Sequence, residues 1–139
     1  MIKTMEQWLT GKRLLIILTT AAAVWFSFAA VMTVLRYRLN YASAYDFGIF
    51  SQMYYYMDKG LSPLTTCERD GLLSHFAVHL SPVFYALLPL YKLVPRPETL
   101  LVLQSLVVIS GMVPLCLLAR TFCFTRLQTL CFGLMYCFY

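Results

Sequence analysis

The sequence predicts an all-α, polytopic transmembrane helical protein, with three spans plus a partial fourth and interfacial helices in the first loop. Hydrophobic residues make up 60% of its 139 residues and charged residues only 12%. Soluble domains average about 45 to 50% apolar and about 25% charged residues. Uncharged runs recur along the whole chain. We therefore expect residues 1–139 to form one transmembrane domain in the cell membrane, with spans at about 14–35, 76–94, 99–119 and 127–139.

The first predicted span has no charged residue from Leu14 to Leu35. As a helix it would cover roughly 33 Å, enough to cross a hydrocarbon core of about 30 Å. A signal peptide has a shorter apolar region, of about 7 to 15 residues, before a small-residue cleavage site. This run is longer and continues to Arg36, so we expect a retained membrane anchor.

The predicted outer loop, residues 36–75, contains four of the six acidic residues. Within it, Asp46 is a candidate N-cap and Gly60 a candidate C-terminal stop for a helix. Apolar residues recur between them at three- and four-residue spacing, as in a helix lying in the membrane interface. They are Ile49, Phe50, Met53, Tyr54, Tyr56 and Met57.

Two further motifs of this loop carry groups that could bind ligands. In "CERDG", Glu68 and Asp70 flank Arg69, and two carboxylates at this spacing bind a divalent metal if both point into one site. The alternative is a solvated loop. In "SHFAVHLSP", His75 and His79 would lie on one face if residues 74–80 are helical. There they could bind the same metal ion, although zinc would need a third ligand. They could equally be polar groups that face a pocket.

The later spans differ in length. Residues 99–119 are uncharged and long enough to cross, whereas the uncharged part of 76–94 is short. There, Pro82 either begins a helix after Ser81, which leaves His79 in an extended segment, or kinks a longer helix. Residues 127–139 would cover only about 20 Å, so we expect the chain to be a fragment of a larger protein, although a small complete protein is the alternative.

Charge and cysteine usage exclude other classes. The net charge is +5, but the basic residues form no groove-like cluster interleaved with aromatic residues, so we expect no nucleic-acid partner. If all spans cross, five basic residues face one side and six the other, which does not settle orientation. The five cysteines show no C-x-x-C spacing, so we expect packing roles for them.

The residues "YDFGIFSQ", "SHFAVHLSPVFYALLPLYKLVPRPETLLVLQSL" and "PLCLLAR" resemble a bacterial multi-spanning family, the domain-of-unknown-function twenty-seventy-nine family. That family is similar to the N-terminal part of GT-C membrane glycosyltransferases. The resemblance covers about residues 41–120. It implies a cytoplasmic N-terminus, an outer loop at 36–75 and, with four spans, a cytoplasmic segment at 92–97. It also implies an essential acid just beyond the first span, the place of Asp46, although the usual D-x-D or E-x-D pair is absent there.

The resemblance implies sugar transfer from a polyprenyl-phosphate donor. Asp46 would be the catalytic base, and His75, His79 and Arg69 would bind the substrate's phosphate. Glu68 and Asp70 would hold a divalent metal if one is used; no other cofactor is expected. Because only the first part of such an enzyme is covered, we expect the chain to be inactive alone.

The alternative function is that of a non-enzymatic membrane protein, either a transporter piece or an assembly subunit. The same polar residues would then line a water-filled entrance. The expected partners are membrane lipid and, in either case, other membrane segments or subunits.

Overall fold

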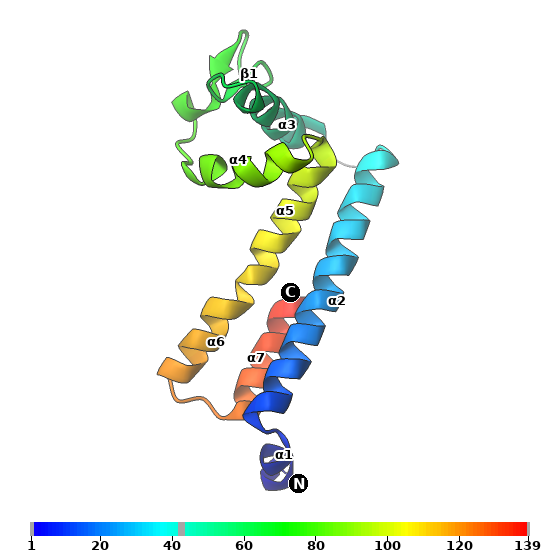
Figure 1. Cartoon of the computed structure of the whole chain (residues 1–139), viewed down its shortest axis with the longest axis vertical. Helices are drawn as coiled ribbons and strands as arrows, with labels where there is room; N and C mark the ends of the chain where they lie inside the picture. The colour runs from blue at the N-terminus through cyan, green and yellow to red at the C-terminus, as the bar shows by residue number, and fades with distance from the viewer. Residues whose placement is uncertain (1, 42–43, 139) are drawn as a thin grey trace. The chain divides into compact units, whose positions relative to one another are not determined.

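The computed structural model describes residues 2–41 and 44–138. The chain divides into two compact units, which are described separately. Unit 1 comprises residues 1–32 and 104–139, and unit 2 comprises residues 33–103. Helices α2 (Gly11–Arg38) and α5 (Pro97–Ser110) each continue from one unit into the other (Figure 1).

Unit 1 consists of helices. It contains α1 (Ile2–Trp8), most of α2, the end of α5, α6 (Met112–Thr121) and α7 (Arg126–Phe138). Its buried core consists of Leu18, Ile109, Met112 and Cys137. Gly133 of α7 is also buried, and a Cβ built there would lie 2.5 Å from Leu18 Cδ2. A small residue at this position therefore lets α7 approach α2 closely, as small residues do between membrane helices.

Two helical segments are long and apolar enough to cross a membrane, Gly11–Arg38 and Pro97–Thr121. They agree with the predicted spans at 14–35 and 99–119. The second is interrupted at Gly111, between α5 and α6. Pro114 explains the interruption, because proline lacks the N–H that would bond to the carbonyl of Ser110 and its ring crowds that carbonyl. Tyr136 of α7 donates a hydrogen bond to the Val108 carbonyl beside this interruption.

The predicted span at 76–94 differs from the structure. Only α4 (Val83–Leu93) is α-helical there, and its length of about 16 Å is roughly half of a hydrocarbon core. The preceding residues form a short 3₁₀ helix, η1 (His75–Ala77), and a loop. Helix α7 matches the predicted segment 127–139 in position but is also too short to cross. Three spans plus a partial fourth are therefore not confirmed.

Unit 2 consists of α3 (Ala44–Asp58), strands β1 (Leu64–Thr65) and β2 (Leu73–Ser74), η1 and α4. The strands pair antiparallel with Leu64 opposite Ser74, which corrects the all-α prediction by one small hairpin. Helices α3 and α4 share a core with the start of α5, which also belongs to unit 2; this core is made of Met53, Tyr54, Met57, Tyr91 and Leu103. Apolar residues of 76–94 thus cover α3 instead of forming a span.

This core also bears on the expected topology. Tyr91 is buried in unit 2, and Nη2 of Arg38, at the end of α2, lies 3.2 Å from Oε1 of Glu98, at the start of α5. Residues 92–97 therefore belong to the same unit as the loop at 36–75. The prediction that a membrane span separates the two segments is not confirmed.

Helix α3 ends as predicted at Gly60. Gly60 has φ +77°, its N–H donates to the Met57 carbonyl, and the next N–H, of Leu61, donates to the Tyr56 carbonyl. This is the Schellman arrangement, which needs a left-handed residue that glycine adopts without strain. It turns the chain from α3 toward the hairpin.

Candidate functional site

The side-chain amide of Gln52 on α3 holds the hairpin. Its Oε1 accepts from the Thr66 backbone N–H (2.8 Å) and the Thr65 hydroxyl (3.2 Å), and its Nε2 donates to Thr66 Oγ1 (3.0 Å). Thr65 Oγ1 in turn accepts from the Cys67 N–H at 3.2 Å. Thr65 is 1% exposed, so these bonds satisfy polar groups that water does not reach. They fix the strand that leads to Glu68.

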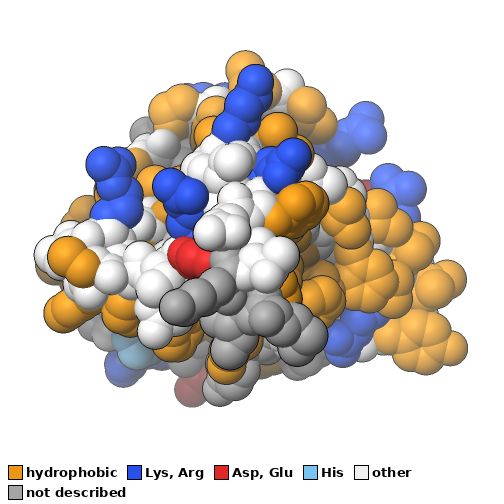
Figure 2. Space-filling model, turned by 90° about the horizontal axis from the view of Figure 1, so that it is seen from below, with side chains coloured by type: hydrophobic (Ala, Val, Ile, Leu, Met, Phe, Trp, Pro, Cys, Tyr) orange, Lys and Arg blue, Asp and Glu red, His pale blue; other side chains and the backbone are white. Residues whose placement is uncertain are grey.

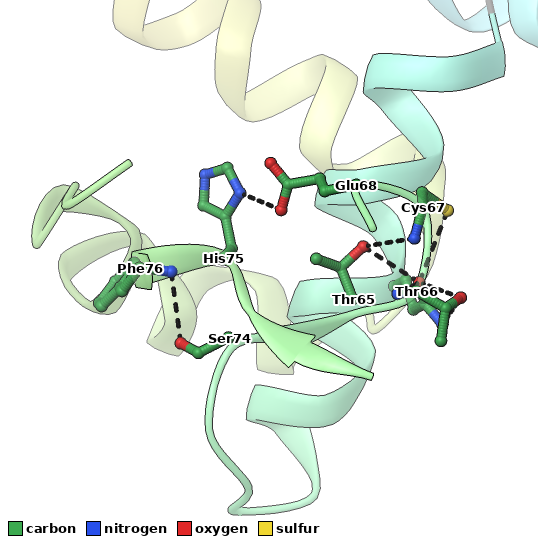
Figure 3. Close-up of polar contacts among 8 residues, drawn as sticks. Thr65, Thr66, Cys67, Glu68, Ser74, His75 and Phe76 are labelled. Carbon is green, nitrogen blue, oxygen red and sulfur yellow. Dashed lines mark hydrogen bonds and ion pairs between the residues drawn. The ribbon is translucent and has the colours of Figure 1, made fainter. Parts of the chain in front are cut away.

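Glu68 and His75 meet across the hairpin (Figure 3). His75 Nδ1 lies 2.9 Å from Glu68 Oε2, and the side chains are 4% and 12% exposed, respectively. The short strand pairing explains the contact, because the His75 N–H continues the ladder by donating to the Pro63 carbonyl at 2.8 Å. Ser74 Oγ caps η1 by accepting from the Phe76 N–H at 3.3 Å. Two residues seven apart in the chain are thereby placed in hydrogen-bond contact.

Aromatic rings surround the imidazole of His75. The ring centroids of Phe50 and Phe84 lie 5.6 and 5.8 Å from it. The His79 ring is also 5.8 Å away, and the His79 N–H donates to the His75 carbonyl at 2.9 Å. The two histidines are therefore neighbours, as their spacing predicted, but through η1 and a loop instead of an α-helix. His75 is buried, whereas His79 is exposed.

Asp46 is the third residue of α3 and lies within its first turn, so the prediction that it is the N-cap is wrong. It is exposed. A carboxylate in the first turn still interacts favourably with the unpaired N–H groups and with the dipole of the helix. Within the described residues, no hydrogen bond or ion pair joins Asp46 to Glu68 or His75.

The other predicted residues, Arg69 and Asp70, lie in the hairpin loop and are exposed. The Gly71 N–H donates to the Arg69 carbonyl at 2.7 Å, which makes the loop turn tightly. Among the residues that the structure describes, no group of three or more His, Cys, Asp or Glu side chains is placed to hold a metal ion. Glu68 is the predicted metal ligand that lies in the site, and its contact is with His75.

Two features of unit 2 were missed by the sequence reasoning. Gln52 carries hydrogen bonds between α3 and the hairpin, and the signal for it was the single amide side chain on a mainly apolar and aromatic helix. Tyr54 is buried and donates to the Phe84 carbonyl at 3.1 Å. Burial raises the pKa of Tyr54 to about 12, because the phenolate would lose its hydration.

The arrangement orients an imidazole. When His75 Nδ1–H donates to the Glu68 carboxylate, its Nε2 is left as an acceptor. Such a nitrogen can accept a hydrogen bond from a substrate that reaches it. A structural role requires no access from solvent.

Two long apolar helices joined by a small folded unit with polar contacts are the features of a helical membrane protein. The family comparison agrees: residues 35–139 match DUF2079, described as "Predicted membrane protein". The chain belongs to this family, as its residues predicted. The curated proteins contain no match, and neither do the solved structures.

Proposed function

We propose that the chain is the sugar-transfer portion of a multi-pass cell-membrane glycosyltransferase of the GT-C type, with unit 2 on the outer face. The observation that carries this proposal is the composition of unit 2. One folded unit, directly after the first apolar helix, contains Asp46 on α3 and the pair formed by Glu68 and His75. Asp46 occupies the place, just beyond the first apolar helix, where the resemblance implies the essential acid of GT-C enzymes.

The proposed reaction transfers a sugar from a polyprenyl-phosphate donor to a hydroxyl group. The acceptor oxygen forms a bond to the anomeric carbon while the bond between that carbon and the phosphate oxygen breaks, which inverts the configuration. Asp46 takes the hydroxyl proton. The electron pair of the broken bond leaves with polyprenyl phosphate, whose charge His75, His79 and Arg69 stabilise.

A divalent metal at Glu68 and Asp70 is a separate part of this proposal. Carboxylate oxygens suit such ions, but a cation at Glu68 would compete with His75 for the same carboxylate. Sugar transfer measured before and after treatment with EDTA tests this part. A loss of transfer that added Mg²⁺ or Mn²⁺ restores is expected if the metal is used; full activity in EDTA contradicts it.

The burial of His75 favours a second function, that of a non-enzymatic transporter piece or assembly subunit. In this case the pair formed by Glu68 and His75 only holds the hairpin against α3. An imidazole that is 3% exposed and enclosed by aromatic rings is accounted for by packing alone.

The experiment that separates these functions substitutes Asp46 and His79, both exposed. Sugar transfer from a polyprenyl-phosphate donor is measured in membranes from cells that express the natural gene at its full extent. For an enzyme, Asp46→Asn should lower turnover about 10² to 10⁴-fold at an unchanged protein level. His79→Ala should have a smaller effect.

Asp70→Asn, an exposed acid in the hairpin loop, is the matched control and should retain transfer when no metal is used. Parental turnover in Asp46→Asn would contradict the assignment of the base. If no preparation transfers sugar, the parental one included, the non-enzymatic function is preferred.

A further inference from the structure

Unit 1 contains a cavity that the proposed reaction does not use. It has a volume of about 730 Å³ and lies between α2, α6 and α7, and ligand pockets are typically about 300 to 1,000 Å³. Its lining residues are Gly11, Leu14, Leu15, Leu18, Thr19, Ala22, Ile109, Met112, Val113, Cys116, Leu117, Arg120, Phe124, Arg126 and Thr129. All belong to unit 1. The groove is thus a property of one compact unit.

The lining follows two helix faces. Residues 11–22 of α2 and residues 109–120 of α5 and α6 contribute at intervals of three and four, so each set forms a single stripe. Each stripe is about 16 Å long, which is close to the roughly 15 Å depth of one leaflet of the hydrocarbon core. The length of the groove therefore matches the length of a lipid acyl chain within one leaflet.

Apolar side chains form the groove, and basic ones mark its end. Leu18 and Met112 are buried at its base, whereas Leu15, Val113 and Leu117 are more than half exposed beside it. Arg120 and Arg126 line the same end as Gly11. The groove thus offers an apolar length for a chain and cations for a headgroup.

The two arginines have no carboxylate partner in the described part of the chain. The single acidic residue of unit 1, Glu6, instead accepts from the backbone N–H groups of Arg126 and Leu127, at 2.8 and 3.0 Å. The guanidinium of Arg126 has a long contact, 3.4 Å, with the Leu9 carbonyl. Glu6 therefore caps α7 and leaves both guanidinium groups available to an anion.

The surface around this end is basic. Figure 2 shows Lys and Arg side chains gathered on the face seen from below, with little acidic surface between them. The described basic residues of unit 1 are Lys12, Arg13, Arg120 and Arg126. A basic cluster beside a membrane helix attracts anionic lipids with about 1 kcal/mol per Lys or Arg, and guanidinium groups bind phosphate through two parallel hydrogen bonds.

We infer that this groove binds an anionic diacyl phospholipid, with an acyl chain along α2 and α6 and the phosphate between Arg120 and Arg126. The inference does not depend on the proposed glycosyltransferase function, because its residues all lie outside unit 2. A zwitterionic lipid would fill the groove equally well but gain less from the cations.

The test uses the full chain, purified in a neutral detergent and depleted of lipid. Binding of phosphatidylglycerol and of phosphatidylcholine with the same acyl chains is measured by native mass spectrometry, together with the thermal unfolding midpoint. Phosphatidylglycerol should bind more tightly and raise the midpoint more. Glycerol phosphate, which has no acyl chain, should do neither.

Two variants separate headgroup from chain. R120Q combined with R126Q should weaken the binding of phosphatidylglycerol about 30-fold, because two cations are lost. It should also remove the preference for phosphatidylglycerol over phosphatidylcholine. L117W, at an exposed position of the groove, should weaken the binding of both lipids, because the larger side chain fills the groove. The matched control combines K92Q with R96Q, two exposed basic residues of unit 2, and should retain the parental preference.

Three outcomes would overturn the inference. They are equal binding of the two lipids by the parental chain, an equal loss in the control variant, and dimerisation through the groove. The last is detected as cross-linking of chains carrying Leu117→Cys without bound lipid.

Discussion

The contact of His75 with Glu68 leads to the sharpest prediction about unit 2. Replacing His75 with Ala leaves a carboxylate that is only 12% exposed without its partner at 2.9 Å. Removing one member of a buried pair typically costs about 3 to 5 kcal/mol. Since Glu68 lies near the surface, it can turn partly into water, and we expect the lower end, about 3 kcal/mol, for opening of the hairpin.

Hydrogen exchange followed by mass spectrometry measures this opening directly. A loss of about 3 kcal/mol corresponds to exchange about 10²-fold faster in residues 64–79. Glu68→Gln retains a hydrogen-bonding side chain for the imidazole, so its effect should be smaller. The double variant His75→Ala with Glu68→Ala should lose less than the sum of the two single variants, because no unpaired carboxylate remains.

His79→Ala is the matched control. His79 is exposed and adjacent to His75, and an exposed substitution typically changes stability by no more than about 0.5 kcal/mol. Exchange in residues 64–79 should therefore stay near the parental rate. The reasoning fails if His79→Ala accelerates exchange as much as His75→Ala, or if His75→Ala leaves it unchanged.

Four further predictions concern the rest of the chain. Gly111→Ala should destabilise the chain by about 1 to 3 kcal/mol, since a Cβ there would clash with the Tyr136 hydroxyl. Adding Tyr136→Phe should recover part of this loss in thermal unfolding, and additive losses would refute the contact. The free energy of unfolding should decrease from about pH 10 to pH 12, because the pKa of Tyr54 is raised to about 12 in the folded chain and its phenol ionises first in the unfolded chain. Tyr54→Phe should make this decrease smaller, and an unchanged decrease contradicts the prediction. Gln52→Leu should expose the hairpin to proteolysis without changing the helix content in circular dichroism, whereas unaltered cleavage would argue against the clamp. Cys67, exposed in the hairpin loop, should react with a membrane-impermeant maleimide in intact cells if unit 2 is outside; reaction only after lysis would place the unit inside.

The sequence predicted well those parts of the fold that depend on local composition. The uncharged runs at 14–35 and 99–119 lie within the two long apolar helical segments, because helix formation satisfies the backbone wherever an apolar chain avoids water. The stop at Gly60 also follows from one residue's access to positive φ. These features need no knowledge of distant contacts.

Residues 76–94 show why apolar composition alone is not enough to identify a membrane span. Their apolar side chains cover α3, and Tyr91 lies in the core with Met53 and Tyr54. An apolar residue buried in a small core and one that faces lipid look the same in the sequence. Pro82 was the better guide, because the helix begins next to it, at Val83, as the first of the two alternatives for that proline predicted.

The candidate site was predicted only in part because its central contact depends on strand register. The histidine spacing indicated that His75 and His79 are neighbours, and their rings are 5.8 Å apart. The contact with Glu68 arises only when Leu64 pairs with Ser74, and two-residue strands have no periodicity to reveal this pairing. Whether Asp46 and Arg69 act on the same substrate stays a prediction.

The corrected fold changes how charge is divided between the ends of the long helices. If α2 and the segment formed by α5 and α6 both cross the membrane, residues 36–98 lie on one side, with six basic and five acidic residues. The other side has five basic residues and Glu6. The number of Lys and Arg residues again does not determine an orientation, but the number of acidic residues differs strongly between the two sides. The end with one acid can attract lipid phosphates, whereas the acid-rich end contains Glu68, which contacts His75, and Asp46, the proposed base. The inferred phospholipid site uses residues of unit 1 and the proposed base lies in unit 2. If both proposals hold, variants of Arg120 should therefore leave Asp46-dependent sugar transfer intact.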